Sequence, residues 1–175
     1  KNYRFNNTIL SGLYGKKERD FKSDMEDLKR SFSSVKNLVT ETEYEINDFI
    51  DNGKSVLFEG AQGFYLDIDF GTYPYVTSSH TYNGGIPTGT GVPLKFTGET
   101  VGVVKAYTTR VGKGPFPTEL RGKTGEFITE QGREFGTTTG RKRRVGWLDL
   151  FMVKYAGMVT GVDTLAITKI DVLAG

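Results

Sequence analysis

The chain has 175 residues with a formal net charge of +2, and 37% of its residues are hydrophobic and 25% charged. This composition is typical of a globular domain, and the small charge argues against a general polyanion binder. The lack of cysteine and the single histidine exclude disulfides, cysteine-based zinc sites and multi-histidine metal centres.

No apolar run reaches the roughly 18 residues of a membrane span, and the first residues lack the apolar core of a signal peptide. We therefore expect a cytoplasmic location and no membrane partner. The chain begins at Lys1 rather than at an initiator Met, which leads us to expect a segment of a longer protein.

The first third of the chain is expected to be mostly helical. Residues 1–15 are polar and mixed, and predict a frayed tail or a strand out of its context. Residues 17–39 predict a helix, because apolar residues recur there at spacings of three and four. That apolar stripe is expected to face a core, and consists of Phe21, Met25, Leu28, Phe32 and Val35. A second helix is expected over 43–51, with Thr40 or Thr42 as its cap and Gly53 as its stop.

The rest of the chain alternates between predicted strands and helices. Residues 54–59 predict a short buried strand, and the long irregular stretch 64–96 predicts a functional loop. Strands are expected over 101–108 and 164–170, and helices over 125–133 and 147–158; a glycine- and proline-rich stretch covers 110–117. Strands interleaved with helices favour an α/β fold with a largely parallel sheet, flanking helices and long ligand-binding loops. We expect one domain or part of one, with 1–54 as a helical lead-in to 55–175.

The last predicted strand ends in Thr168-Lys169-Ile170-Asp171. Ligands of open α/β sheets bind at the carboxyl ends of the strands. A carboxylate there can accept the N1–H and N2–H of guanine together, while the lysine stem lies along the purine face. The motif resembles the guanine-reading Asn-Lys-x-Asp of GTPases, with Thr168 in place of Asn. Lys-x-Asp after a strand is also common without such a role.

Residues 136–144 form a loop rich in glycine, threonine and arginine. Its hydroxyl and backbone N–H groups can surround an anion, and its guanidinium groups can bind a carboxylate or phosphate in bidentate fashion. A solvated basic run or a nucleic-acid contact is the alternative. The near balance of charge makes small anionic ligands the better fit.

Two further stretches carry polar groups suited to a nucleotide. Gln62 follows the predicted strand 54–59, and its amide suits a purine edge or a transferring phosphoryl group. Thr77 and its neighbours offer hydroxyl groups to a phosphate. Both stretches are also compatible with ordinary turns. His80 has no evident carboxylate partner in the sequence and is interpreted as a loop residue.

Taken together, these stretches resemble the adenylosuccinate synthetases in motif and in order, over about residues 55–175. The matching segments are Leu57–Gly63, Leu66–Asp69, Gly71–Ser79, Lys105–Gly112, Gly114–Leu120, Thr138–Arg144, Gly146–Asp149 and Thr168–Asp171. Residues 1–54 match the family's preceding helical region loosely. The resemblance implies GTP-dependent ligation of L-aspartate to IMP in AMP biosynthesis, within a P-loop-NTPase-like domain of a homodimer.

The resemblance also implies residue roles. Gln62 would contact O6 of IMP and support the transferring phosphoryl group, Thr77 would hold the 5′-phosphate, and the Val111 backbone would contact the ribose. An aspartate-binding loop would consist of Thr137, Thr138, Thr139, Gly140, Arg141, Lys142 and Arg143. Within it Arg141 would also contact IMP, and Arg143 the GTP. The guanine would be read by Lys169, Ile170 and Asp171.

Several parts of the family pattern are absent from this sequence. These are the N-terminal Gly-Asp-Glu-Gly-Lys-Gly-Lys loop, the catalytic aspartate and histidine, the Mg²⁺ ligands, the arginine donated across the dimer and the C-terminal part that covers guanine. His80 stands where the family often has Asn. We therefore expect no catalytic residue and no metal ligand in this chain, and an inactive isolated segment. A purine-nucleotide-binding module without catalysis is the alternative, and a nucleic-acid binder a weaker one.

Overall fold

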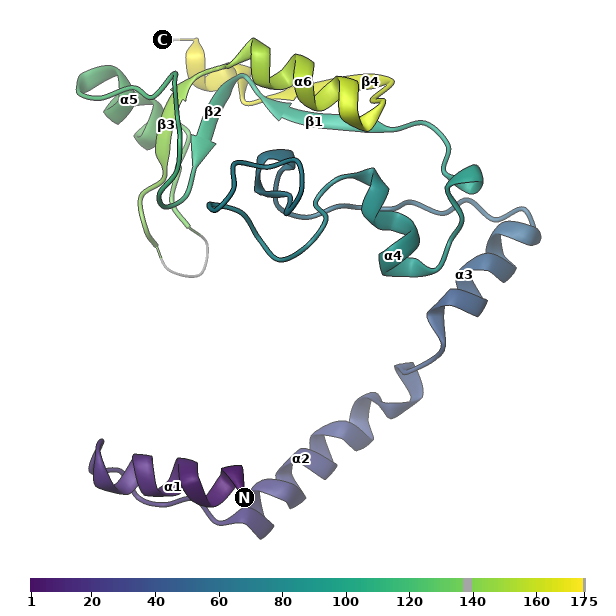
Figure 1. Ribbon diagram of the computed structural model, residues 1–175, viewed down its shortest axis with the longest axis vertical. Helices are drawn as coiled ribbons and strands as arrows, with labels where there is room; N and C mark the ends of the chain where they lie inside the picture. The colour runs from purple at the N-terminus through teal and green to yellow at the C-terminus, as the bar shows by residue number, and fades with distance from the viewer. Residues whose placement is uncertain (137–139, 175) are drawn as a thin grey trace. The chain divides into compact units, whose positions relative to one another are not determined.

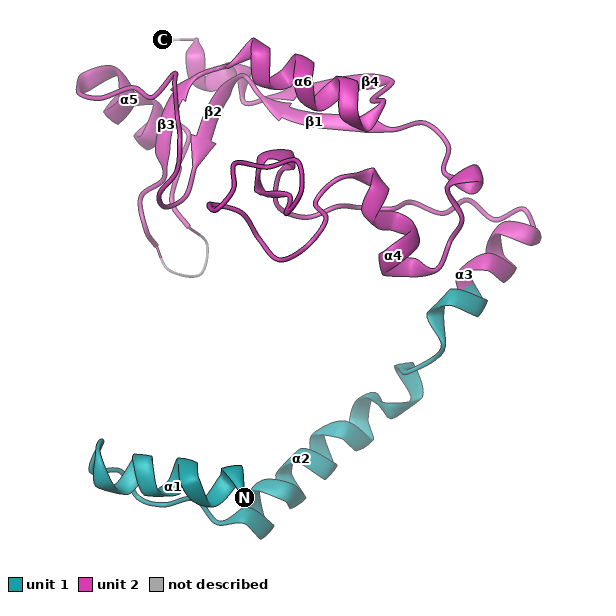
Figure 2. Cartoon of the chain, viewed as in Figure 1, with its two compact units in different colours: residues 1–45 teal, residues 46–175 magenta. Residues whose placement is uncertain are grey.

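The computed structural model describes residues 1–136 and 140–174, and divides the chain into two compact units, Lys1–Glu45 and Ile46–Gly175 (Figures 1 and 2). Within the described ranges, no helix is both long and apolar enough to cross a membrane.

The first unit contains two helices, α1 (Asn2–Gly12) and α2 (Phe21–Val35), followed by a 3-10 turn (Lys36–Leu38). The α2 helix begins at Asp20, whose carboxylate accepts a 2.8 Å hydrogen bond from the Ser23 N–H. Such N-caps satisfy a backbone donor that has no intrahelical partner.

Asp24 joins the two helices of this unit. Its carboxylate accepts hydrogen bonds from the Tyr3 hydroxyl at 2.6 Å and from two nitrogens of Arg19 at 2.7 Å each. The bonds from Arg19 and Tyr3 lower the pKa of Asp24 to about 2. The two helices are thus connected largely by exposed polar contacts.

The structure confirms the predicted helix at 17–39 over most of its length but shows the prediction for residues 1–15 to be wrong, since they form α1. There the Asn7 side chain exchanges hydrogen bonds with the backbone of Arg19, tying α1 to the turn before α2. The apolar stripe on α2 is mostly exposed rather than buried: Leu28, for example, is 61% exposed, and Met25 is half-buried. The predicted helix at 43–51 is confirmed as α3 (Thr42–Asp51).

The second unit is built on two small sheets (Figure 1). Strand β1 (Val101–Lys105) pairs in parallel with β4 (Thr164–Thr168), and β2 (Tyr107–Arg110) pairs antiparallel with β3 (Arg144–Trp147). The predicted strand at 101–108 is therefore divided at Ala106 between both sheets. The α/β fold with a parallel sheet is confirmed; the antiparallel pair was not predicted, because its second strand lies in the region assigned to a loop and a helix.

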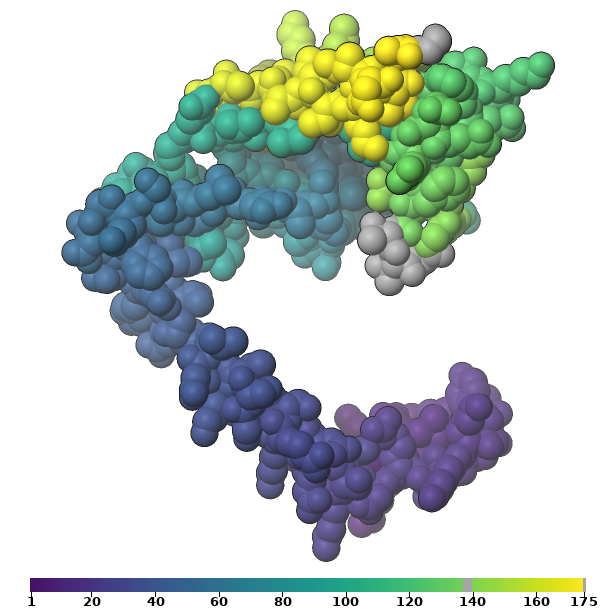
Figure 3. Space-filling view, turned by 180° about the vertical axis from the view of Figure 1, so that it is seen from behind, coloured from purple at the N-terminus to yellow at the C-terminus, as the bar shows by residue number. Residues whose placement is uncertain are grey.

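The core of this unit lies where the antiparallel pair meets α5 (Lys123–Gln131) and the 3-10 turn after β4 (Ile170–Leu173). Its buried members are Tyr107, Ile128, Val145 and Val172, with Leu120 packed against them. In the space-filling view the C-terminal residues lie directly against those of β1 and α5 (Figure 3). The core therefore supports the strand ends on which the candidate ligand residues lie.

Helix α6 (Leu150–Thr160) begins later than predicted. Asp149 caps it by accepting a 3.1 Å hydrogen bond from the Met152 N–H, while Trp147 still belongs to β3. The helix ends at Gly161, which has φ +61° and thus the left-handed conformation that favours glycine.

The predicted strand at 54–59 is not present: these residues are extended without a strand partner in the described ranges, and Leu57 is 91% exposed. A strand needs a hydrogen-bonded neighbour, which local sequence does not supply. The irregular character of 64–96 is confirmed. It contains 3-10 turns and one short helix, namely Phe64–Leu66, Asn83–Gly85, α4 (Ile86–Thr90) and Leu94–Phe96.

Candidate functional site

The structure links Gln62 to Thr77 through one hydroxyl. The Ser79 hydroxyl donates a 3.3 Å hydrogen bond to the amide oxygen of Gln62 and lies 3.2 Å from the Thr77 hydroxyl. Gln62 is exposed and has φ +71°, a conformation unfavourable for a residue with a side chain. Backbone outliers of this kind are typical of functional segments. Two residues predicted for IMP are therefore brought to one place.

Asp67 stabilises the conformation of the segments that carry Gln62 and Thr77. Its fully buried carboxylate accepts hydrogen bonds from the N–H groups of Thr81 at 2.8 Å, Asp69 at 2.9 Å and Phe70 at 3.1 Å. Burial raises the pKa of the Asp67 carboxyl, but these hydrogen bonds outweigh it and the net pKa lies below the ordinary value. Asp67 thus fastens the segment after Gln62 to the segment after Thr77.

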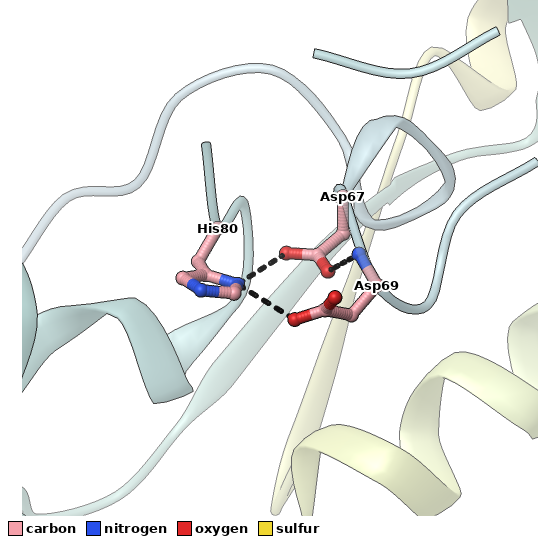
Figure 4. Close-up of side chains that lie close together, drawn as sticks. All are labelled: Asp67, Asp69 and His80. Carbon is pink, nitrogen blue, oxygen red and sulfur yellow. Dashed lines mark hydrogen bonds and ion pairs between the residues drawn. The ribbon is translucent and has the colours of Figure 1, made fainter. Parts of the chain in front are cut away.

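His80 points toward two carboxylates, those of Asp67 and Asp69 (Figure 4). Its Nδ1 lies 3.5 Å from Asp67 Oδ2 and 3.7 Å from Asp69 Oδ2. No carboxylate partner of His80 was evident in the sequence, and the structure provides two; His80 does lie in a loop, as interpreted. The partners come from a turn more than ten residues earlier, which the chain brings back only in three dimensions.

These three residues are the group of possible metal ligands in the described ranges. They do not suit Mg²⁺, because that ion prefers an octahedral set of oxygen ligands and the buried carboxylate of Asp67 already accepts three backbone N–H groups. We derive no catalytic step through this group.

Val111 lies in the glycine-rich turn after β2, with its side chain exposed. Arg110 ties this turn to the segment before Thr77. Its guanidinium donates hydrogen bonds to the Lys113 carbonyl at 3.0 Å, the Thr72 hydroxyl at 2.8 Å and the Tyr75 carbonyl at 3.0 Å. The two segments predicted to contact IMP are thereby connected through Arg110, which is half-buried.

A second arginine supports the same turn from β3. Arg144 forms a bidentate ion pair with Glu119 at 2.6 and 2.7 Å, and its third nitrogen donates to the carbonyls of Gly112 at 3.2 Å and Gly114 at 2.9 Å. The Arg144 hydrogen bond lowers the pKa of the Glu119 carboxyl. Because the guanidinium of Arg144 is held by Glu119, its hydrogen bonds to Gly112 and Gly114 fix the position of the turn after β2.

The residues on either side of the predicted aspartate loop, 134–136 and 141–143, are joined by backbone hydrogen bonds and are called the stem here. Thr137, Thr138 and Thr139 lie outside the described residues. On either side, the Gly136 N–H donates to the Arg141 carbonyl at 2.8 Å and the Arg143 N–H donates to the Glu134 carbonyl at 2.9 Å. Gly140, at φ +62°, has the left-handed conformation that a tight turn requires. Arg141 and Lys142 are exposed.

Glu134 anchors this stem through its side chain. The carboxylate is 1% exposed and accepts hydrogen bonds from the Tyr107 hydroxyl at 2.6 Å, Lys105 Nζ at 2.7 Å and Arg143 Nη1 at 3.0 Å. Burial raises the pKa of the Glu134 carboxyl, but the three donors outweigh it and the net pKa lies below the ordinary value. Burial and the bond to Glu134 also raise the pKa of Tyr107.

The predicted guanine reader lies at the end of β4. Lys169 has φ +61°, and its Nζ donates a 2.8 Å hydrogen bond to the Gly132 carbonyl. Ile170 and Asp171 are exposed at the start of the following 3-10 turn. The charge of Asp171 contributes to the raised pKa of Tyr107, so both lie within electrostatic range.

Two contact networks therefore contain some of the predicted ligand residues. Gln62 and Thr77 belong to one, which also includes Arg110, the residue before Val111. Arg143 and Lys169 belong to the other, and Asp171 follows Lys169 by two positions. The residues that sequence reasoning missed are the internal connectors Glu134, Glu119, Arg110, Arg144 and Asp67. No pattern in the sequence indicates these residues, because each acts through partners that only the fold brings near.

The comparisons agree with the motifs. The family model described as adenylosuccinate synthetase matches residues 1–175. Curated adenylosuccinate synthetases are 52% identical over 173 residues in Caldicellulosiruptor bescii and 49% identical over 175 residues in Caldanaerobacter subterraneus subsp. tengcongensis. The match covers 99% and 100% of this chain, which spans 41% of the length of each relative.

Solved structures also include an adenylosuccinate synthetase that resembles this chain. The fully ligated adenylosuccinate synthetase of Plasmodium falciparum superposes with a TM-score of 0.85 at 43% identity, over 98% of this chain and 40% of that one. The succinoaminodeoxyadenylate synthetase of cyanophage S-2L has a TM-score of 0.60 at 23% identity over 71% of this chain and 38% of that one, which supports the fold alone. The chain belongs to the adenylosuccinate synthetase family.

Proposed function

We propose that this chain supplies the IMP-, aspartate- and guanine-binding segments of an enzyme that ligates L-aspartate to IMP at the expense of GTP. The observation that carries the proposal is the family match over all 175 residues, which includes every residue to which a ligand role is assigned. The two contact networks support it, because each joins residues assigned to a shared ligand.

In this chemistry N1 of IMP loses its proton to a residue outside this chain while the γ-phosphoryl group of GTP moves to O6 of IMP, giving GDP and a 6-phosphoryl intermediate. The amine of aspartate then attacks C6, the C6–O6 bond breaks, phosphate leaves and the amine loses a proton. Gln62 would donate to the oxygen that gathers charge, as positioned amide donors do in such transfers. Thr77 would hold the 5′-phosphate and the Val111 backbone the ribose.

The basic residues would provide the remaining ligand contacts. Arg141 and Arg143 would bind the aspartate carboxylates, with Arg141 also at IMP and Arg143 at GTP. Thr137, Thr138, Thr139, Gly140 and Lys142 would complete the loop. Lys169, Ile170 and Asp171 would read guanine. Mg²⁺ would be bound by residues outside this chain and would neutralise charge on the phosphates. The complete enzyme would act in the cytoplasm as a homodimer.

Calorimetric titration distinguishes this proposal from its alternatives. We expect the full-length protein containing this segment to bind IMP and GDP but not a single-stranded oligonucleotide. Binding of both nucleotides without formation of adenylosuccinate would favour a nucleotide-binding module. Oligonucleotide binding with a steep salt dependence would instead indicate a nucleic-acid contact.

A further inference from the structure

We infer that Glu134 is a positioning residue, whose buried carboxylate fixes the Arg143 guanidinium at the strand ends and so sets the affinity for aspartate and GTP. The inference rests on the proposed function, because it takes Arg143 as a ligand contact. Glu134 has no assigned ligand role, and lies outside the glycine-, threonine- and arginine-rich motif.

The carboxylate of Glu134 is a junction between three parts of the fold. Lys105 ends β1, Tyr107 begins β2, and Arg143 directly precedes β3. Both carboxylate oxygens are used: Oε1 accepts from Lys105 and Tyr107, and Oε2 accepts from Arg143. A group so fully hydrogen-bonded cannot shift without breaking several charge-assisted bonds, which makes it a rigid reference point for Arg143.

The hydrogen bonds of Arg143 leave part of its guanidinium available. Glu134 takes Nη1 at 3.0 Å, whereas the buried Nε has no hydrogen-bond partner among residues 1–136 and 140–174. Nε is too deeply buried to meet a ligand, but the Arg143 side chain as a whole is 29% exposed, which leaves part of it open to a ligand. Glu134 thus restrains the arginine without using all of its donors.

Arg144, the first residue of β3, provides a comparison with Arg143 beside it. It pairs with Glu119 in a similar partly buried contact, but its remaining donor goes to the carbonyls of Gly112 and Gly114, beside Val111. Two consecutive arginines are therefore held by two glutamates, one pair at the aspartate loop and the other at the IMP turn. The two pairs should affect different substrates.

The test is a crossed comparison of Glu134→Gln and Glu119→Gln in the full-length protein, with KM measured for all three substrates. Glu134→Gln should raise KM for aspartate and GTP by about tenfold, the loss of roughly one charge-assisted hydrogen bond, with KM for IMP within twofold. Glu119→Gln should raise KM for IMP and leave KM for aspartate within twofold. A merely structural role for Glu134 predicts equal changes in all three values, and that result would overturn the inference.

Tyr107→Phe provides a second, milder variant should Glu134→Gln fold poorly. It removes one hydrogen bond to the same carboxylate without changing charge, so KM for aspartate should rise by about two- to fivefold and KM for IMP should not change. An unchanged aspartate KM in this variant contradicts the inference. If the unaltered full-length protein makes no adenylosuccinate, the proposed function fails; if it does and both variants bind aspartate normally, the role of Glu134 alone fails.

Discussion

Lys169 donates its ammonium hydrogen bond to the carbonyl of Gly132, only two residues before Glu134. The residue proposed to lie along guanine and the residue proposed to hold Arg143 therefore contact one short segment, 132–134. This segment follows α5 and is buried at Gly132 and Glu134. The proposed guanine reader and the proposed aspartate loop thus contact the same buried segment.

Arg141→Leu should raise KM for aspartate by at least about tenfold, because a guanidinium–carboxylate contact is replaced by an apolar side chain. Steady-state kinetics with aspartate varied at saturating IMP and GTP measure this effect. Arg30→Leu is the control, since Arg30 is a highly exposed arginine of α2 in the first unit, outside both networks, and its aspartate KM should not change. Equal KM values in Arg141→Leu and the parent protein would assign the loop to another ligand.

Asp171→Asn should weaken the binding of GTP and shift the nucleotide preference toward a xanthine nucleotide. The neutral amide loses a charge-assisted bond of roughly 1.5–3 kcal/mol to guanine, and it offers a donor to the extra oxygen of xanthine. Competition between GTP and XTP reports the change. Asp163→Asn, before the opposite end of β4, is the control and should keep the preference for GTP. An unaltered preference in Asp171→Asn would remove Asp171 from the base reader.

Asp67→Asn should destabilise the segment that carries Gln62 and Thr77. The carboxylate accepts three backbone hydrogen bonds, and an amide would direct its own donor at one of those N–H groups, at a cost of about 1–3 kcal/mol. Thermal unfolding at pH 7 should show a lower midpoint. The control is Asp69→Asn, whose exposed carboxylate makes no such backbone bonds in the described chain, and it should leave the midpoint nearly unchanged.

The same carboxylate predicts a pH dependence. Because the folded-state pKa of Asp67 is depressed, its contribution to stability is present above the unfolded pKa of about 3.9 and is lost as pH falls through the folded value. The parent protein should therefore lose more stability than Asp67→Asn between pH 5 and pH 2. Parallel loss in both proteins would show that Asp67 titrates normally.

The isolated 175-residue chain should form no adenylosuccinate, because the proton-transfer residues expected for the family are not in its sequence. A coupled assay for GDP and direct chromatography of the product test this expectation. Product from the purified chain would show that residues within it carry out both proton transfers.

Several elements of the fold were predictable because local sequence determines them. The helices α2 and α6 follow from apolar periodicity, although the cap at Asp149 that starts α6 at Leu150 was not predicted. The division of 101–110 into β1 and β2 was not predictable, since it depends on which distant strands supply hydrogen bonds. The strand predicted at 54–59 failed for the same reason, as its apolar pattern says nothing about a neighbour.

The ligand residues of the candidate site were found through motifs, whereas their supports were not. Gln62, Arg143 and Asp171 stand in glycine-rich or strand-end patterns with evident chemistry. The partners of the Glu134 carboxylate are 9 to 29 positions away along the chain. Thr81, one partner of the Asp67 carboxylate, is 14 positions away. Nothing in single-sequence patterning indicates such pairs, because ion pairing depends on three-dimensional proximity.

The most direct test of the central claim uses the full-length protein with IMP, GTP, Mg²⁺ and nitrogen-15-labelled L-aspartate. The account predicts adenylosuccinate, GDP and phosphate in equal amounts, with the label on the nitrogen joined to C6 and no product when any one substrate is omitted. GTP hydrolysis without labelled adenylosuccinate, or no reaction while IMP and GTP both bind, would contradict it.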